Sequence, residues 1–260
     1  MKIDIVIPTL NSASVLDDCL TSIKNHISYN AIIVVDGGST DKTIDICKKY
    51  GCKIYVCKKS LGDSRMLGIS KAETDWLLFI DSDIVVDALF FRELKKYIKE
   101  DVGAIQGDAV LPENYYNYDG RKKPKELDKK ERGYTNCTLI RSRLVKSINL
   151  RGINAYEDWL LKNHILDKGY KWLSVSVPVK HFEDYKGHVD RGLKARWNGA
   201  GLRKSKVTSH IYIIKWFFGI TFKSPVEKKP TYGNYIGNLK YFFNTLIGYL
   251  FYREYDKIER

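Results

Sequence analysis

Two carboxylates, Asp81 and Asp83, stand one residue apart directly after the uncharged apolar run of residues 76–80. Such a run is typical of a strand buried on both faces, and open α/β sheets bind ligands at the carboxyl ends of their strands. Two carboxylates this close repel each other, and a divalent cation whose oxygen shell is completed by a diphosphate would relieve that repulsion. Helix capping is the alternative, because Asp83 or Asp87 could cap a helix over residues 88–99.

A second acidic pair, Glu157 and Asp158, opens the helix that we expect over residues 158–167. A carboxylate placed there can accept the proton of a reacting hydroxyl, which makes Asp158 the first candidate for a general base and Glu157 the second. Acids in a first helical turn also complement the helix dipole, so the pair could be structural instead. His181 is a further candidate, although a lone histidine is often an ordinary interior residue.

The segments that position these residues alternate between apolar strands and helices of about 10 to 13 residues, which predicts a Rossmann-like, doubly wound α/β sheet, mostly parallel, with helices on both faces. The candidate residues should lie along its carboxyl edge. A charged segment rich in Tyr and Asn, residues 111–132, is expected to form a long loop. Strands are expected at residues 3–7, 31–35, 53–57, 76–81, 104–110, 134–140, 171–175 and 179–182, and further helices at residues 15–27, up to residue 49, and 62–69.

The length of 260 residues suits one α/β domain with an appendage. We expect a catalytic domain over residues 1–185 and a basic, aromatic-rich helical region over residues 186–260. Within the latter, residues 211–222 and 235–252 are dominated by aromatic and aliphatic side chains, but neither is an unbroken apolar run of about 20 residues. We therefore expect amphipathic helices, either packed on the domain or lying at a membrane surface, rather than a transmembrane span.

The net charge of +13 is concentrated in residues 181–260, which hold 15 Lys and Arg against seven Asp and Glu. A basic surface suits nucleic acid, anionic lipid or anionic substrates, or is simply a solvated face. The five cysteines form no C-x-x-C pair, which indicates reduced thiols and no zinc site. Because a strand is expected almost at the N-terminus, we expect no signal peptide. We therefore expect a cytoplasmic location, either free or attached peripherally to the cytoplasmic face of the membrane.

Five motifs now stand in order: Ile-Pro-Thr-Leu-Asn at residues 7–11, Val-Asp-Gly-Gly-Ser-Thr-Asp at residues 35–41, Asp-Ser-Asp at residues 81–83, Glu-Asp at residues 157–158, and His181. Each is weak alone, but five in register are specific. In this respect residues 1–185 resemble the family 2 glycosyltransferases of the GT-A fold. The resemblance implies an inverting enzyme that moves a sugar from a nucleoside diphosphate to an acceptor hydroxyl or phosphate.

The resemblance also implies roles for single residues. Thr9, Asn11 and Asp36 would hold the base and ribose of the nucleotide sugar, and Arg65 would lie near its diphosphate. Asp81 would face the ribose and the metal, Asp83 and His181 would ligate Mg²⁺ or Mn²⁺, and Asp158 would be the base, with Glu157 beside it. One departure is Gly37, where the family often has a second acidic residue.

For the partners of such an enzyme, the resemblance favours a UDP-sugar donor, with a GDP-sugar as the alternative. A glycan or a polyprenyl-phosphate-linked molecule is the expected acceptor. Two other classes of protein are the alternatives to a glycosyltransferase. A nucleotidyltransferase acting on sugar phosphates should carry a Gly-rich loop after the first strand, and residues 8–12 do not form one. A nucleic-acid-binding protein would explain the charge but not paired carboxylates, which repel phosphates, so we expect no nucleic-acid partner.

Overall fold

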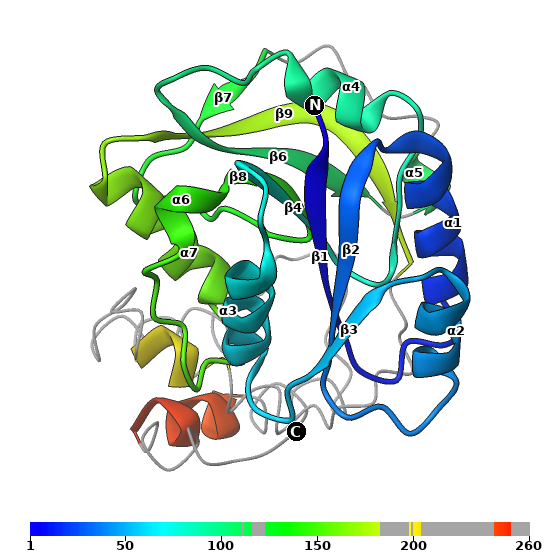
Figure 1. Ribbon diagram of the computed structural model, residues 1–260. Helices are drawn as coiled ribbons and strands as arrows, with labels where there is room; N and C mark the ends of the chain where they lie inside the picture. Colours follow the sequence, from blue (N-terminus) through cyan, green and yellow to red (C-terminus); the bar gives the residue numbers. More distant parts are fainter. Residues whose placement is uncertain (111, 116–122, 183–197, 199, 204–241, 251–260) are drawn as a thin grey trace.

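A nine-stranded sheet runs through the centre of the protein in the computed structural model, with helices on both of its faces (Figure 1). The structure describes residues 1–110, 112–115, 123–182, 198, 200–203 and 242–250. The strand order is β3-β2-β1-β4-β8-β6-β9-β5, and β7 pairs with β9. The strands are β1 (Ile3–Thr9), β2 (Tyr29–Asp36), β3 (Lys53–Val56), β4 (Trp76–Ile80), β5 (Ile84–Val85), β6 (Val102–Val110), β7 (Lys125–Glu126), β8 (Cys137–Arg141) and β9 (Lys171–His181).

Two hydrophobic cores, one on each face, explain why the central strands are apolar throughout. In β1, Ile5 and Ile7 point into the core under α1, whereas Val6 points into the core under α3. Figure 1 shows α1, α2 and α4 on one side of the sheet and α3, α6 and α7 on the other. The helices are α1 (Leu16–His26), α2 (Thr43–Lys49), α3 (Leu61–Lys71), α4 (Phe90–Lys95), α5 (Pro112–Tyr115), α6 (Ser142–Val145) and α7 (Glu157–Asp167).

The sheet has a parallel half and a mixed half. Strands β3, β2, β1 and β4 are parallel, as the alternation of strands and helices predicted. Strand β8 is antiparallel to both β4 and β6, β6 and β9 are parallel, and β5 is antiparallel to β9. This last pairing sets Ile84 opposite His181, so the segment after β4 reaches the end of the last strand.

Several predicted bounds were wrong for identifiable reasons. The two strands expected at residues 171–175 and 179–182 are one strand, β9, because extra residues of β9 at a register shift against β6 accommodate Pro178 opposite Asp108. The helix expected over residues 88–99 is confined to α4, and the carboxylate of Asp87, not that of Asp83, accepts the N–H groups of residues 89 and 90 where this helix begins. The loop expected over residues 111–132 contains α5 and β7 in its described part.

The C-terminal region is described in two pieces. Residues 242–250 form a helix whose Phe242 and Tyr249 are buried and pack against Leu202. Gly201 lies against the backbone just before α7, because a Cβ at this position would come within 2.3 Å of the carbonyl oxygen of Ala155. No helix among the described residues is long and apolar enough to cross a bilayer. The segment 211–222 and the expected domain boundary at residue 185 lie outside the described residues, so both remain predictions.

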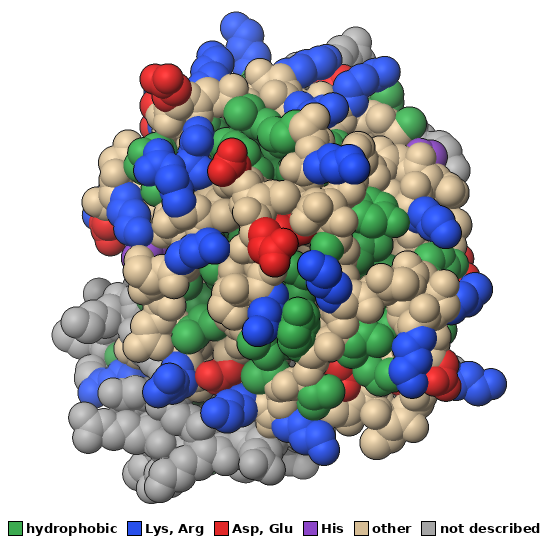
Figure 2. All heavy atoms as spheres, viewed as in Figure 1, with side chains coloured by type: hydrophobic (Ala, Val, Ile, Leu, Met, Phe, Trp, Pro, Cys, Tyr) green, Lys and Arg blue, Asp and Glu red, His purple; other side chains and the backbone are tan. Residues whose placement is uncertain are grey.

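Lys and Arg side chains are spread over the whole face seen in Figure 2, with acidic side chains between them. A protein that tracks a nucleic-acid backbone gathers its basic side chains in a patch or stripe. On this face the positive charge is scattered, as expected of a solvated surface.

Candidate active site

Asp83 and His181 face each other across the antiparallel pair of β5 and β9. His181 Nε2 lies 3.2 Å from Asp83 Oδ2, and the N–H of Phe182 donates to the Asp83 carbonyl at 2.9 Å. Asp83 Oδ1 is buried and has no hydrogen-bond partner among the described residues. Two residues that are 98 positions apart are therefore brought together by strand pairing, as a shared site requires.

Arg65 joins two of the other candidates into one ion cluster. Its Nη2 lies 3.2 Å from Asp81 Oδ1 and its Nε 3.3 Å from Glu157 Oε1, while its guanidinium carbon lies 5.0 Å from the centre of the Phe79 ring. Arg65 is only 2% exposed, and its Nη1 has no partner in the described part of the chain. It therefore fixes the end of β4 relative to the start of α7, and leaves a buried donor available.

The cluster holds more negative than positive charge. Burial raises the pKa of Glu157, and the attraction of Arg65 opposes this effect only in part. Desolvation likewise raises the pKa of Asp81 although about a third of that side chain is exposed, and repulsion from Asp83 acts in the same direction. Neighbouring carboxylates that resist ionisation together are a common property of catalytic sites.

Asp158, the candidate base, is bound by Arg132 from the loop that precedes β8. Both Nε and Nη2 of Arg132 lie 3.0 Å from Asp158 Oδ2, and Asp158 Oδ1 accepts the N–H of Trp159 at 2.7 Å. The residue before the helix, Tyr156, has a left-handed backbone with φ 66°. A bulky residue in this region is strained, and strain of this kind is concentrated at functional sites.

The loop after β2 is folded around the carboxylate of Asp36. Its Oδ2 accepts the N–H groups of Gly38 at 2.7 Å and Ser39 at 2.8 Å, and its Oδ1 lies 3.3 Å from the hydroxyl of Thr9. Asn11, whose φ is 49°, donates its own N–H to Ser39 Oγ at 2.8 Å. The three predicted nucleotide-binding residues thus lie together at the carboxyl ends of β1 and β2, where Asp36 also shapes the loop.

A divalent ion would find two protein ligands here, Asp83 and His181, and the partnerless Oδ1 of Asp83 is the kind of oxygen that a hard cation takes. Asp81, the other expected ligand, is bound to Arg65. Within the described ranges, no three His, Cys, Asp or Glu side chains are gathered closely enough to hold a metal ion. Because Mg²⁺ is usually bound through one or two carboxylates plus substrate phosphates, the pair fits such an ion together with a diphosphate.

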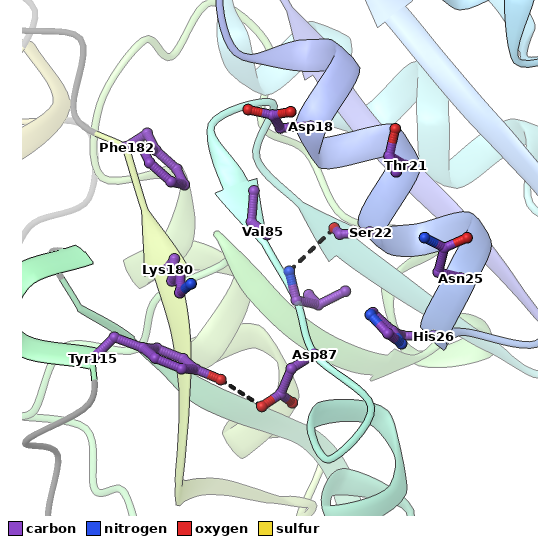
Figure 3. A pocket seen from close by; sticks show the side chains of 11 residues that line it. Asp18, Thr21, Ser22, Asn25, His26, Val85, Asp87, Tyr115, Lys180 and Phe182 are labelled. Carbon is purple, nitrogen blue, oxygen red and sulfur yellow. Dashed lines mark hydrogen bonds between the residues drawn. The ribbon is translucent and has the colours of Figure 1, made fainter.

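A groove of about 490 Å³ lies beside this site, between α1 and the β5–β9 pair. Figure 3 shows Asp18 and Asn25 on the α1 side of the groove. They face Lys180, which is on β9, and Phe182, which directly follows that strand. None of the predicted site residues lines it, although Phe182 directly follows His181. The groove therefore adjoins the candidate site without containing it.

Sequence reasoning missed two basic residues of the site. Arg132 was assigned to a charged loop, and Lys162 to the interior of a helix. Lys162 is fully buried, lies one turn after Asp158, and donates through Nζ to the carbonyl groups of Asp128 and Glu131. The signal that could have marked Lys162 was its position as a lysine in the middle of the hydrophobic face of a helix. Arg132 belongs to no sequence motif, so no such signal marked it.

Comparison with known proteins gives one family. The model of the family described as "Glycosyl transferase family 2" matches residues 4–148. Among curated proteins, the poly(ribitol-phosphate) beta-N-acetylglucosaminyltransferase TarS of Staphylococcus aureus is 26% identical over 174 residues, which are 63% of this chain and 29% of TarS. The chain thus spans less than a third of the length of that relative.

Solved structures agree in fold. The S. aureus TarS fragment 1–349 in complex with UDP-GlcNAc has a TM-score of 0.57 at 17% identity, covering 98% of this chain and 92% of that one. Glucosyl-3-phosphoglycerate synthase of Mycobacterium tuberculosis, in complex with Mn²⁺ and UDP-glucose, has a TM-score of 0.59 at 17% identity, covering 80% of each chain. Both are glycosyltransferases of the GT-A fold, and the described sheet has that fold.

Proposed function

Because the chain belongs to glycosyl transferase family 2, we propose that it transfers a sugar from a nucleoside diphosphate sugar to an acceptor hydroxyl or phosphate, with inversion at the anomeric carbon. The observation that carries this proposal is the arrangement at the end of β4. There a partnerless carboxylate oxygen of Asp83 beside His181 lies next to the cluster of Arg65, Asp81 and Glu157. Such a site can bind a metal diphosphate on one side and a reacting hydroxyl on the other.

The proposed donor is a UDP-sugar, with a GDP-sugar as the alternative. The structure of TarS holds UDP-GlcNAc and that of glucosyl-3-phosphoglycerate synthase holds UDP-glucose, and both share the fold of this chain. Thr9, Asn11 and Asp36 lie at the ends of β1 and β2, where a nucleotide binds in open α/β sheets. Their hydroxyl, amide and carboxylate groups suit a base and a ribose.

The chemical steps divide among named residues. A divalent ion held by Asp83 and His181 would supply Lewis-acid stabilisation of the departing diphosphate. Arg65 fixes Asp81 and Glu157 relative to each other, and so keeps the donor side and the base side in one geometry. Asp158, at the start of α7, takes the proton of the acceptor hydroxyl as the new bond forms.

We further propose that the acceptor is a glycan or a polyprenyl-phosphate-linked molecule, reached at the cytoplasmic face of a membrane. On the helix of residues 242–250, Phe243, Ile247 and Leu250 are exposed by 54%, 38% and 51%. Their spacing sets them on one side of the helix. An apolar row of this kind in a basic region suits shallow insertion between anionic headgroups.

The donor is tested by thermal denaturation with UDP-, GDP- and dTDP-sugars, each with and without Mn²⁺. A ligand that binds only the folded state raises the melting temperature, so one nucleotide class should do so, and more strongly with Mn²⁺. Release of the free nucleoside diphosphate in the presence of acceptor then measures transfer, and NMR of the product gives its anomeric configuration. An unchanged melting temperature with every nucleotide sugar, with and without metal, would overturn the proposal.

A further inference from the structure

The carboxylate assigned as the base is not open to an incoming hydroxyl. Asp158 is 5% exposed, its Oδ1 is used by the N–H of Trp159, and its Oδ2 is used by both Nε and Nη2 of Arg132. A carboxylate oxygen has two lone pairs, so Oδ2, which already accepts two N–H groups of Arg132, can take a hydroxyl proton only when one of these bonds is given up. The bond to Trp159 is part of the helix start, so the Arg132 bond is the one that can be exchanged.

We propose that Arg132 caps the base and that a phosphate group of the acceptor, next to the reacting hydroxyl, draws it away. The inference rests on the proposed function, which makes Asp158 the base, and it extends that function by assigning the acceptor a phosphate. A guanidinium binds phosphate through the same pair of N–H groups that it offers to a carboxylate. The exchange therefore costs Arg132 no hydrogen bonds, and it frees Asp158 Oδ2 where the hydroxyl arrives.

The backbone that carries Arg132 is firmly held on both sides. Lys162 Nζ donates to the carbonyl groups of Asp128 and Glu131, and the N–H of Tyr134 donates to Gln106 Oε1 at 3.0 Å. The buried lysine therefore acts as a positioning residue, since it sets the loop against the helix of the base from one turn away. Only the Arg132 side chain has to move for the cap to open.

The side chain itself is placed where it can move. The Arg132 side chain is 45% exposed, although the carboxylate it binds is buried. Its guanidinium carbon lies 5.2 Å from the centre of the Tyr134 ring and 5.1 Å from that of the Tyr156 ring. Cation–π contacts with these two rings would keep the guanidinium near the site while its N–H groups exchange a carboxylate for a phosphate.

The acceptor test compares kcat/KM for a sugar phosphate with kcat/KM for the same sugar without phosphate, at saturating donor. In the wild type, the phosphate-bearing acceptor should be favoured by 10-fold or more, which is about the value of one charge-assisted hydrogen bond. In Arg132→Gln this ratio should fall towards one, and in Arg132→Lys it should lie between, because lysine keeps the charge but not the paired N–H groups. Arg143→Gln is the matched control, since Arg143 also contacts a tyrosine, Tyr170, but away from the site, and it should keep the wild-type ratio.

A second measurement needs no turnover. In ¹⁵N-labelled wild-type protein, the Nε–H resonance of Arg132, identified by its loss in Arg132→Lys, should shift when inorganic phosphate is added and stay in place when the neutral sugar is added. If that resonance ignores phosphate, or if Arg132→Gln and Arg132→Lys keep the wild-type acceptor ratio, the cap is refuted. If the wild type itself consumes no nucleotide sugar, the proposed function has failed instead. The phosphate titration alone then decides whether Arg132 leaves Asp158.

Discussion

His181 Nε2 and Asp83 Oδ2 lie 3.2 Å apart, although the two residues are separated by 98 positions along the chain. The other oxygen of Asp83 is buried and has no partner among the described residues. A buried carboxylate oxygen without a partner is costly, and the divalent ion proposed above would satisfy it. Asp83 is therefore the residue at which the proposed metal dependence can be tested most directly.

Replacing Asp83 with alanine should remove metal-dependent donor binding and leave the fold intact. The change takes away a ligand and also relieves repulsion with Asp81, so the melting temperature should not fall. Calorimetric titration with UDP in the presence of Mn²⁺ measures the effect, and Asp75→Asn, at an exposed carboxylate, is the control. Full transfer activity in EDTA would contradict this assignment.

Asp158→Asn should lower kcat by roughly 10² or more and leave donor affinity nearly unchanged, because asparagine keeps the shape but cannot take a proton. Glu157→Gln should reduce the melting temperature more and kcat less, since Glu157 is bound to the buried Arg65. Steady-state kinetics and thermal denaturation of the two variants separate these effects. Should Glu157→Gln prove the more damaging to kcat, the two residues would exchange roles.

Asp4→Asn should destabilise the protein by about 1–3 kcal/mol at pH 7, because buried amide donors would lose their carboxylate. Burial alone would raise the pKa of Asp4, but hydrogen bonds from Asn30 and from the N–H groups of Glu73 and Thr74 outweigh it, and the pKa is lowered from 3.8. Stabilisation of this sign is complete above the pKa of the unfolded chain and is lost as the pH falls through the folded value.

The difference between wild type and Asp4→Asn in the free energy of unfolding should therefore be constant between pH 7 and pH 5 and shrink below about pH 4. Denaturant unfolding at several pH values measures it. Asp45→Asn, at an exposed position of α2, should show little difference at any pH. A gap that grows on acidification would refute the assignment.

Binding to liposomes should increase with their content of anionic lipid and should fall when Phe243, Ile247 and Leu250 are all replaced with serine. Sedimentation with liposomes measures both effects. The control variant replaces Val56 and Leu89, which are exposed by 60% and 48% elsewhere on the surface. Binding that ignores lipid charge, or that the triple replacement leaves unchanged, would argue for a purely structural helix.

The family and the α/β fold were predictable from sequence, and both predictions are confirmed. Short-range patterns carry that information, because strands buried on both faces are apolar throughout and the site motifs sit where these strands end. Asp4 is a charged residue within the apolar first strand. Its carboxylate in fact binds the turn before β4, which no local pattern reveals.

The contact between Arg132 and Asp158 was beyond sequence reasoning for a similar reason. The two residues are 26 positions apart, and a charged loop offers many arginines and lysines of which any could approach an acid. Only the antiparallel course of β8 and the buried Lys162 determine which one does. Pairings of this kind depend on tertiary packing, whereas the roles predicted for Thr9, Asn11 and Asp36 await a bound nucleotide.

The close approach of Gly201 to the carbonyl oxygen of Ala155 bears on how the protein can be divided in the laboratory. Residue 155 precedes the strained Tyr156 and the two acids that open α7, so this neighbour supports the backbone from which Asp158, the proposed base, projects. A fragment that ends at residue 185 would contain every predicted site residue and still lack that support. Expression of the catalytic part alone should therefore retain the chain at least through Arg203, and any side chain introduced at Gly201 would push directly on the loop before the base.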